Sequence, residues 1–130
     1  MARNKPQNIG QPGRFAYQGL DRLIHEKARL SILSSLAAHG DGLVFSDLKT
    51  LCALTDGNLS RQITQLQEAG LVEVWKGHKG NRPQTLVRLS AQGQKRFLEY
   101  LGVLEGVLHD ASSTARRPTA AAAPANGLLA

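Results

Sequence analysis

The hydrophobic positions that follow Thr55 repeat with the period of an α-helix. Leu59, Ile63 and Leu66 are four and three residues apart, so they share one face that turns toward a core. Thr55 can cap the first turn through its hydroxyl, and Gly70 can end the helix in a left-handed conformation. The pattern therefore predicts a helix with a defined start and a defined end.

The opposite face of this predicted helix is polar. It carries Gly57, Arg61, Thr64, Gln65 and Glu68, flanked by Asn58, Ser60 and Gln62. Amide, hydroxyl and guanidinium groups can bond base edges in a DNA major groove. An ordinary solvent-exposed helix face has the same composition, so this face alone does not decide between the two interpretations.

Helical spacing also predicts structure before this helix. Apolar residues recur from Leu20 to His39, and the polar run at residues 25–27 marks a break between two linked helical pieces. His25 is expected to be a capping or core residue, because no second metal ligand stands three or four residues away. Residues 43–45 form a short apolar run and are expected to be an edge strand.

A short helix is expected to follow, with Ser46 as its N-cap. Leu48, Leu51 and Cys52 are expected to face inward, and Cys52 is interpreted as a small buried hydrophobic residue. This helix should end near Leu54. The connection to the next helix is then very short, which is typical of a helix-turn-helix.

The pattern changes to an alternation of apolar and polar residues after the second of these helices. Residues 71–75 and 84–89 alternate and are predicted to be two strands. Residues 76–83 contain two glycines, one proline and three cations, so we expect a flexible, basic hairpin tip. After a helix-turn-helix, such a hairpin is typical of a wing that contacts the sugar-phosphate backbone or the minor groove.

Ser90 is expected to cap a last, long helix. Within it, Phe97, Leu101, Leu104 and Leu108 are four, three and four residues apart, which is typical of a helix pair. Because this stripe is longer than one small domain can cover, we expect it to form a homodimer interface. Packing against the chain's own first helix is the alternative.

Composition indicates an acidic partner. The chain has 130 residues and a formal net charge of +6, and residues 55–96 hold seven cations and three anions. We expect residues 1–14 to be a disordered basic tail, 15–109 the folded domain and 110–130 a disordered Ala/Pro-rich tail. The single cysteine and the lack of a long apolar run favour a cytoplasmic protein without membrane segments.

Taken in order, these elements resemble a winged helix-turn-helix transcriptional regulator over about residues 20–108. The resemblance is to the compact winged-helix group of the MarR-like and ArsR-like regulators. Its pattern I-H-x-x-x-R-L-x-I-L is matched at residues 24–33, and L-T-D-G-N-L-S-x-x-I-x-x-L-x-x-A-G-L-V at residues 54–72. The wing pattern G-x-x-G-x-R-P is matched at residues 77–83, and L-S-x-x-G at residues 89–93.

This resemblance implies a mainly α fold with a small β-hairpin, a winged helix-turn-helix followed by a long C-terminal dimerisation helix. It implies a homodimer that binds double-stranded DNA. The expected DNA-binding residues are Thr55, Gly57, Asn58, Ser60, Arg61, Thr64, Gln65, Lys76, His78, Lys79, Asn81 and Arg82. Among these, we expect Arg61 to pair with guanine, and Gln65 or Asn58 with adenine.

Several features limit what else is expected. The paired cysteines of ArsR-type metal sensors are not matched, because only Cys52 is present, so no metal or cofactor is predicted. No Ser/His/Asp arrangement or paired histidine ligands point to an enzyme. An unidentified small-molecule effector is implied only by the MarR-like relatives. The alternative function is a winged-helix module for protein–protein interaction, although the basic wing favours DNA.

Overall fold

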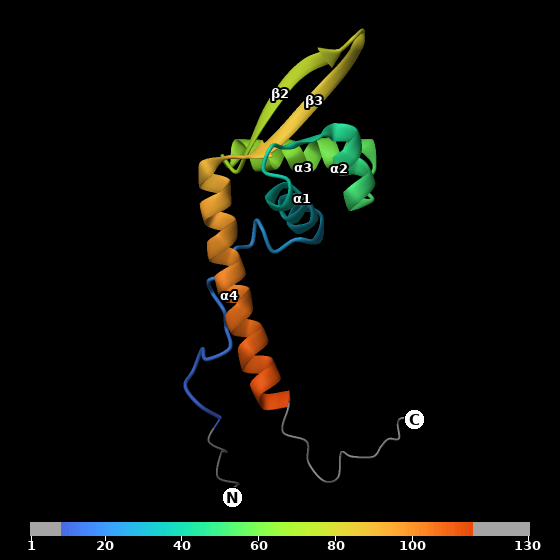
Figure 1. Cartoon of the computed structure of the whole chain (residues 1–130). Helices are drawn as coiled ribbons and strands as arrows, with labels where there is room; N and C mark the ends of the chain where they lie inside the picture. The colour runs from blue at the N-terminus through green and yellow to red at the C-terminus, as the bar shows by residue number, and fades with distance from the viewer. Residues whose placement is uncertain (1–8, 116–130) are drawn as a thin grey trace, which may run out of the picture.

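The computed structural model describes residues 9–115 of the chain. Its elements are, in order, α1 (Lys27–Ala38), β1 (Leu43–Val44), α2 (Phe45–Cys52), α3 (Asp56–Glu68), β2 (Val72–Lys79), β3 (Arg82–Leu89) and α4 (Ala91–Ala115). In Figure 1, α1, α2 and α3 form a compact body, the β2–β3 hairpin projects from one side, and α4 runs away from the other. The predicted fold class is confirmed.

The strands form one antiparallel sheet in the order β1-β3-β2. Short β1 lies at the edge and pairs only with β3, as predicted. Pairing of β2 with β3 runs from Val72 opposite Leu89 at the base to Lys79 opposite Arg82 at the tip. The strands are therefore longer than predicted, since residues 76–79 and 82–83, which were assigned to the hairpin tip, are paired. Ladder hydrogen bonds come from the backbone, so a polar, glycine-containing sequence does not prevent pairing once the base of the hairpin is held.

The core lies where α1, α3, the base of the sheet and the start of α4 meet. The inward face predicted for α3 is buried: Leu59, Ile63 and Leu66. Thr55 Oγ1 accepts the backbone N–H of Asn58 at 3.2 Å, which confirms the N-cap. At the other end Gly70 has a φ of +79°, which confirms the left-handed residue that ends the helix.

Residues 20–26 form turns, whereas the sequence predicted the first of two helical pieces there. The Asp21 carboxylate accepts the N–H of Leu23 at 3.0 Å. Glu26 is the N-cap of α1 and accepts the N–H of Arg29 at 2.9 Å. Acidic side chains that bond nearby N–H groups compete with helix formation, so the helix starts only after Glu26. The polar run at residues 25–27 therefore marks the start of α1 and not a break between two helices, so this prediction was wrong.

Helix α2 begins earlier than predicted. Val44 occupies its N-cap position, so the prediction of Ser46 as the cap was wrong. Leu48 is fully buried and Cys52 is half-buried, but Leu51 is 55% exposed, which corrects its predicted inward orientation. The last turn of α2 lies at the edge of the body, where less of the core remains to cover it (Figure 1).

The start of α4 is fixed closely to the end of α3 and the start of β2. Ser90 Oγ accepts the N–H of Gly93 at 2.8 Å, which confirms the predicted cap, and donates to the carbonyl of Gly70 at 2.6 Å. A Cβ atom on Gly93 would lie 1.9 Å from the carbonyl oxygen of Leu71. Only glycine fits this approach, which explains the glycine of the L-S-x-x-G motif.

The helix that follows is longer than predicted. It continues to Ala115, so residues 110–115 are helical although the sequence placed them in a disordered tail. Residues 116–130 of that expected tail lie outside the described part of the chain. Alanine, serine and threonine dominate residues 111–115. Alanine is the strongest helix former, so the helix can extend into this segment.

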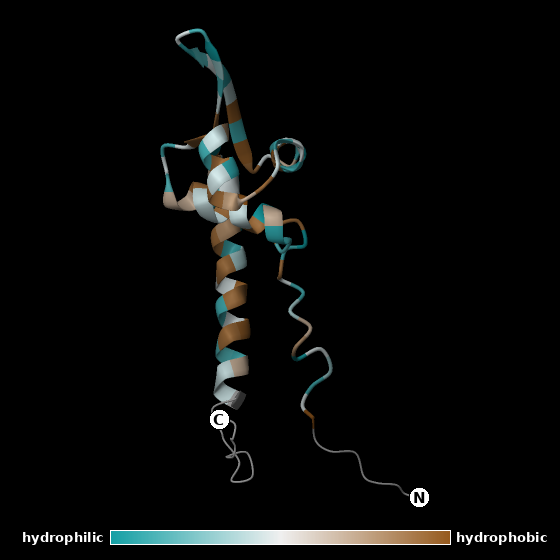
Figure 2. Ribbon diagram, turned by 90° about the vertical axis from the view of Figure 1, so that its right-hand side faces the viewer, coloured by the Kyte–Doolittle hydropathy of each residue, from teal (hydrophilic) through white to brown (hydrophobic). Residues whose placement is uncertain are grey.

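The apolar stripe of α4 is divided between the core and the surface. Phe97 is 4% exposed and lies in the chain's own core, so the prediction that it forms a dimer interface was wrong. Leu101 and Leu104 are half-buried against that core. Leu108 is 61% exposed. The alternative of intrachain packing therefore holds for the start of the stripe, and the exposed surface lies toward its end (Figure 2).

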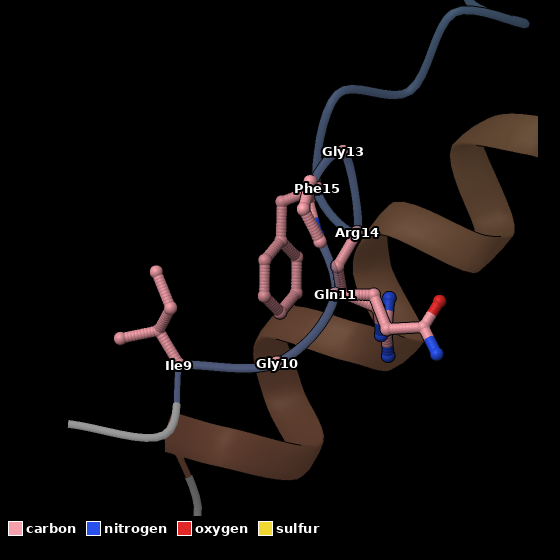
Figure 3. A pocket seen from close by; sticks show the side chains of 7 residues that line it. Ile9, Gly10, Gln11, Gly13, Arg14 and Phe15 are labelled. Carbon is pink, nitrogen blue, oxygen red and sulfur yellow. The ribbon is translucent and has the colours of Figure 1, made fainter. Parts of the chain in front are cut away.

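Residues 9–26, here called the N-terminal strap, follow α4 (Figures 1 and 3). Both Nη atoms of Arg14 donate to the Asp110 carboxylate, at 2.9 and 3.1 Å, and the Tyr17 hydroxyl donates to it at 2.7 Å. These bonds hold the pKa of Asp110 down at about 2. The strap thus includes the end of the tail predicted to be disordered, whose residues 1–8 lie outside the described part.

Nearer the body, the strap is bonded to α4 at two further points. Asp21 forms an ion pair with Arg96, and the hydrogen bonds from that guanidinium lower the pKa of Asp21. His25 Nδ1 lies 2.6 Å from the hydroxyl of Tyr100, whose side chain is buried and whose pKa is raised by that burial. His25 was predicted to be a cap or a core residue, but it is an exposed hydrogen-bond partner of a core tyrosine.

Candidate nucleic-acid interface

The turn between α2 and α3 presents α3 at the surface. Ala53 ends α2 in a left-handed conformation with φ of +53°, and Lys49 forms a 3.0 Å ion pair with Asp56 across the turn. On α3 and its N-cap, the exposed residues among those predicted to bind DNA are Thr55, Gly57, Ser60, Arg61, Thr64 and Gln65, whereas Asn58 is half-buried. A free polar face therefore runs along this helix.

Side-chain bonds order part of this face. Arg61 Nη2 donates to Asn58 Oδ1 at 3.1 Å, and the Gln62 amide nitrogen donates to the same oxygen at 3.1 Å. Thr64 Oγ1 donates to the backbone carbonyl of Ser60 at 3.0 Å, which turns its methyl group outward from that bond. The guanidinium of Arg61 is thus held near the N-terminal half of the helix.

Arg29 of α1 is a further residue of this network. It is the arginine of the pattern I-H-x-x-x-R-L-x-I-L, but it was not among the residues predicted to form the site. Its Nη1 atom donates to Gln62 Oε1 at 2.8 Å and to Gln65 Oε1 at 2.7 Å. Its Nε atom donates to the carbonyl of Leu23 at 2.6 Å. The motif marks this arginine, but its partners on α3 follow only from the packing of α1 against α3.

The hairpin carries the other predicted DNA-binding residues, all of them exposed: Lys76, His78, Lys79, Asn81 and Arg82. Side chains alternate between the two faces of a strand. Lys79 and Arg82, which are opposite each other in the register, lie on one face, and Lys76 and His78 lie on the other. The charge is therefore distributed over both faces of the tip, which is the hydrophilic end seen in Figure 2.

Trp75 is a large exposed side chain near the base of the hairpin, 44% exposed. The guanidinium of Arg88 stacks over its ring at 4.7 Å and forms a 3.3 Å ion pair with Glu73. Nothing in the sequence pattern joins these residues, because the pairing depends on the strand register. Since Arg88 is engaged in this way, it contributes less free positive charge than the cations at the tip.

A surface hollow of about 710 Å³ lies between the hairpin and the start of α2. Lys79 and Arg82 line it from the hairpin, and Ser46 and Asp47 from the first turn of α2. Helix N-termini and basic side chains both favour anions. The Asp47 carboxylate opposes that preference locally, so the cationic part of the hollow is the hairpin side.

Among residues 9–115, no group of three or more His, Cys, Asp or Glu side chains is placed to hold a metal ion. In the same range, no helix is long and apolar enough to cross a membrane. The hollow drawn in Figure 3 is lined only by residues 9–15, so it lies within one turn of the strap. The charged and polar groups of α3 and the hairpin remain the candidate site.

The architecture and this site are those of a winged helix-turn-helix. Residues 28–108 match the family model described as "Winged helix DNA-binding domain", and the chain belongs to that family. One relative in sequence is the uncharacterized protein MJ0432 of Methanocaldococcus jannaschii, 35% identical over 57 residues, which cover 44% of this chain and 62% of that protein. The match thus spans less than two thirds of the relative.

Several solved structures share this fold. A transcriptional regulator homologue from Pyrococcus horikoshii is 28% identical with a TM-score of 0.64, covering 69% of this chain and 88% of that one. MarR has a TM-score of 0.63 at 20% identity, covering 76% and 72%. MepR of S. aureus, solved with DNA, has a TM-score of 0.62 at 20% identity, covering 77% and 81%. The last two support the fold alone. The family is described as a DNA-binding domain, and the Pyrococcus horikoshii protein is described as a transcriptional regulator homologue.

Proposed function

We propose that this chain is a sequence-specific transcriptional regulator that binds double-stranded DNA as a homodimer. In this proposal α3 enters the major groove, and the β2–β3 wing contacts the backbone or the minor groove. The observation that carries it is the exposed polar face of α3 beside a paired, basic hairpin on the same side of the body (Figure 1). The similarity to a transcriptional regulator homologue supports this function.

The homodimer is supported by the exposed part of α4. This helix has 25 residues and is therefore about 37 Å long at ~1.5 Å per residue. Leu98 and Leu108 are 58% and 61% exposed, which leaves large apolar side chains on a helix that extends beyond the body. Large exposed apolar surfaces mark interaction sites. A two-fold axis along α4 would present two α3 helices to successive major grooves.

The proposal also includes a small-molecule effector, because one structural neighbour, NadR, has been solved in complex with 4-hydroxyphenylacetate. In this chain a hollow of about 170 Å³ lies between α1, the end of β3 and α4. Leu36, Leu89 and Phe97 line it. Ligand sites usually have about 300–1,000 Å³, so a ligand here would have to open the hollow further.

Selection of bound duplexes from a random DNA pool tests the main proposal. We expect enrichment of a palindromic motif, because two identical recognition helices related by a two-fold axis read the same half-site twice. A motif without symmetry would contradict the dimeric mode of reading. Lack of enrichment with the folded full-length protein would contradict sequence-specific binding and favour the alternative, a module for protein–protein interaction.

A further inference from the structure

We infer that α3 reads keto bases, guanine or thymine, because Arg29 fixes the orientation of its side-chain amides. The inference rests on the proposed function and concerns the bases that this helix prefers. It assigns Arg29 as a positioning residue, which acts through Asn58, Gln62 and Gln65. These three residues are here called the amide row.

The guanidinium of Arg29 contacts the amide row, and the side chain of Arg29 is only 16% exposed. It donates to Gln62 Oε1 at 2.8 Å and to Gln65 Oε1 at 2.7 Å, and it is anchored by the Leu23 carbonyl at 2.6 Å. A guanidinium can only donate hydrogen bonds. Both glutamines must therefore turn their oxygen atoms toward Arg29, and the NH₂ group of each points elsewhere.

The orientation of the Gln62 amide in turn determines the orientation of the Asn58 amide. Gln62 is buried, and because its oxygen faces Arg29, its amide nitrogen donates to Asn58 Oδ1 at 3.1 Å. Arg61 Nη2 donates to the same oxygen at 3.1 Å. Asn58 thus has its oxygen occupied by two donors. Within residues 9–115, no side chain accepts from the NH₂ groups of Asn58 and Gln65, so these donors remain for a ligand.

The groups that Asn58, Gln65 and Arg61 offer to a groove are consequently donors: the two free NH₂ groups and the guanidinium. In the major groove guanine presents two adjacent acceptors, N7 and O6, and thymine presents the acceptor O4. Adenine pairs its one acceptor, N7, with the donor N6, and cytosine presents the donor N4. A bidentate amide–adenine pair needs both the oxygen and the nitrogen of the amide. Because Arg29 binds the oxygen of Gln65, and Gln62 and Arg61 bind the oxygen of Asn58, the expectation that Gln65 or Asn58 pairs with adenine gives way to a preference for keto bases.

A purely structural role for Arg29 is the competing explanation, since it also joins α1 to α3. The two explanations make different predictions for the selected base. If Arg29 only joined α1 to α3, replacing it would not change which base is selected. Motifs should be selected from a random duplex pool with the wild-type protein, Gln65→Ala, Arg29→Met and Gln62→Met, each checked for folding by circular dichroism. In Gln65→Ala, the motif position that loses its preference identifies the base read by Gln65.

At that position we expect guanine or thymine with the wild-type protein. Arg29→Met should free Gln65 Oε1, so that adenine becomes acceptable and its frequency relative to guanine rises about tenfold. Gln62→Met is the matched control. It separates Arg29 from Asn58 but keeps the bonds from Arg29 to Gln65 and Leu23, so the Gln65 position should keep its preference while another position broadens.

Three results would overturn the inference: adenine or cytosine at the Gln65 position in the wild-type motif, no position that responds to Gln65→Ala, or a folded Arg29→Met variant with an unchanged motif. If Arg29→Met does not fold, the motifs of the wild-type protein, Gln65→Ala and Gln62→Met still test whether the Gln65 position selects guanine or thymine. A wild-type protein that selects no motif would instead refute the proposed function itself, so the two failures are distinguishable.

Discussion

At the scale of single residues, the arginines differ in whether a neighbouring side chain already pairs with or stacks on their guanidinium group. Arg96 and Arg14 are paired with carboxylates of Asp21 and Asp110. Arg88 is stacked on Trp75. Arg61 is exposed on α3 and bonded only to the neutral Asn58 side chain, so its charge is not neutralised by a carboxylate in the described part of the chain.

Arg61→Ala should therefore weaken binding to the selected DNA site by about 1–3 kcal/mol and relax one position of each half-site. Folding should barely change, because the side chain is exposed. Fluorescence anisotropy on selected and random duplexes would measure both affinities. Arg22→Ala, at an exposed arginine of the strap, is the control. An equal weakening on both duplexes would show that Arg61 holds phosphate.

Local signals explain which residues could be predicted from the sequence. The ends of α3 depend on Thr55 and Gly70, and its buried face depends on spacing within the helix, so a short window contains all the information. Arg29 and Gln65 are 36 residues apart, and Arg14 and Asp110 are 96 apart. Such contacts depend on how the elements pack, and the pattern within each element does not encode them.

At the scale of elements, two of the three glycines of α4, Gly93 and Gly102, lie in opposite surroundings. A Cβ atom on Gly93 would meet the Leu71 carbonyl oxygen at 1.9 Å, whereas one on Gly102 would meet nothing within 4 Å. The first glycine is required by a close approach to the backbone. The second costs the helix conformational entropy without a compensating contact.

Gly93→Ala should accordingly destabilise the fold by about 1–3 kcal/mol, since backbone must move to admit the methyl group. Gly102→Ala should stabilise it by about 0.5–1 kcal/mol. Urea unfolding followed by circular dichroism would compare the two variants directly. Opposite signs are the expected outcome, and a neutral Gly93→Ala would contradict the close packing of α4 on β2.

The wing should act on DNA mainly through charge. Lys79→Ala and Arg82→Ala should each weaken binding to all duplexes alike and lower the salt dependence of log K by about 1 for each phosphate that is no longer neutralised. Lys95→Ala, at an exposed lysine of α4, should leave the slope unchanged. Titrations at several salt concentrations would give the slopes. Unchanged slopes for both wing variants would remove the wing from the interface.

At the scale of the whole molecule, the proposed homodimer would depend on the part of α4 that the chain itself does not cover. Leu108→Asp would place a charge in the proposed interface at a residue that is 61% exposed. Burying an unpaired charge costs several kcal/mol, so the dimer should dissociate while the monomer stays folded. Leu51→Asp, at a leucine 55% exposed on α2, is the matched control. Sedimentation of a wild-type monomer at tens of micromolar would contradict the dimer.

The strap should respond to acid. The folded protein lowers the pKa of Asp110 from 3.8 to about 2, so its charged form favours the bonds to Arg14 and Tyr17. This contribution is present above the unfolded pKa and disappears as the pH falls toward 2. Arg14→Ala should raise the pKa of Asp110 toward its usual value, as measured by NMR titration. An unchanged pKa would mean that Arg14 does not hold the carboxylate.

The pairing of β2 with β3 out to Lys79 and Arg82 also has a mechanical consequence. A hairpin bonded along its full length works as a stiff arm, so its tip keeps a set distance from α3. We expect a duplex to meet both at once only if its local bend and groove width suit that distance. The energy of deforming the duplex depends on its sequence, so bases that no side chain touches would also influence which operators are bound.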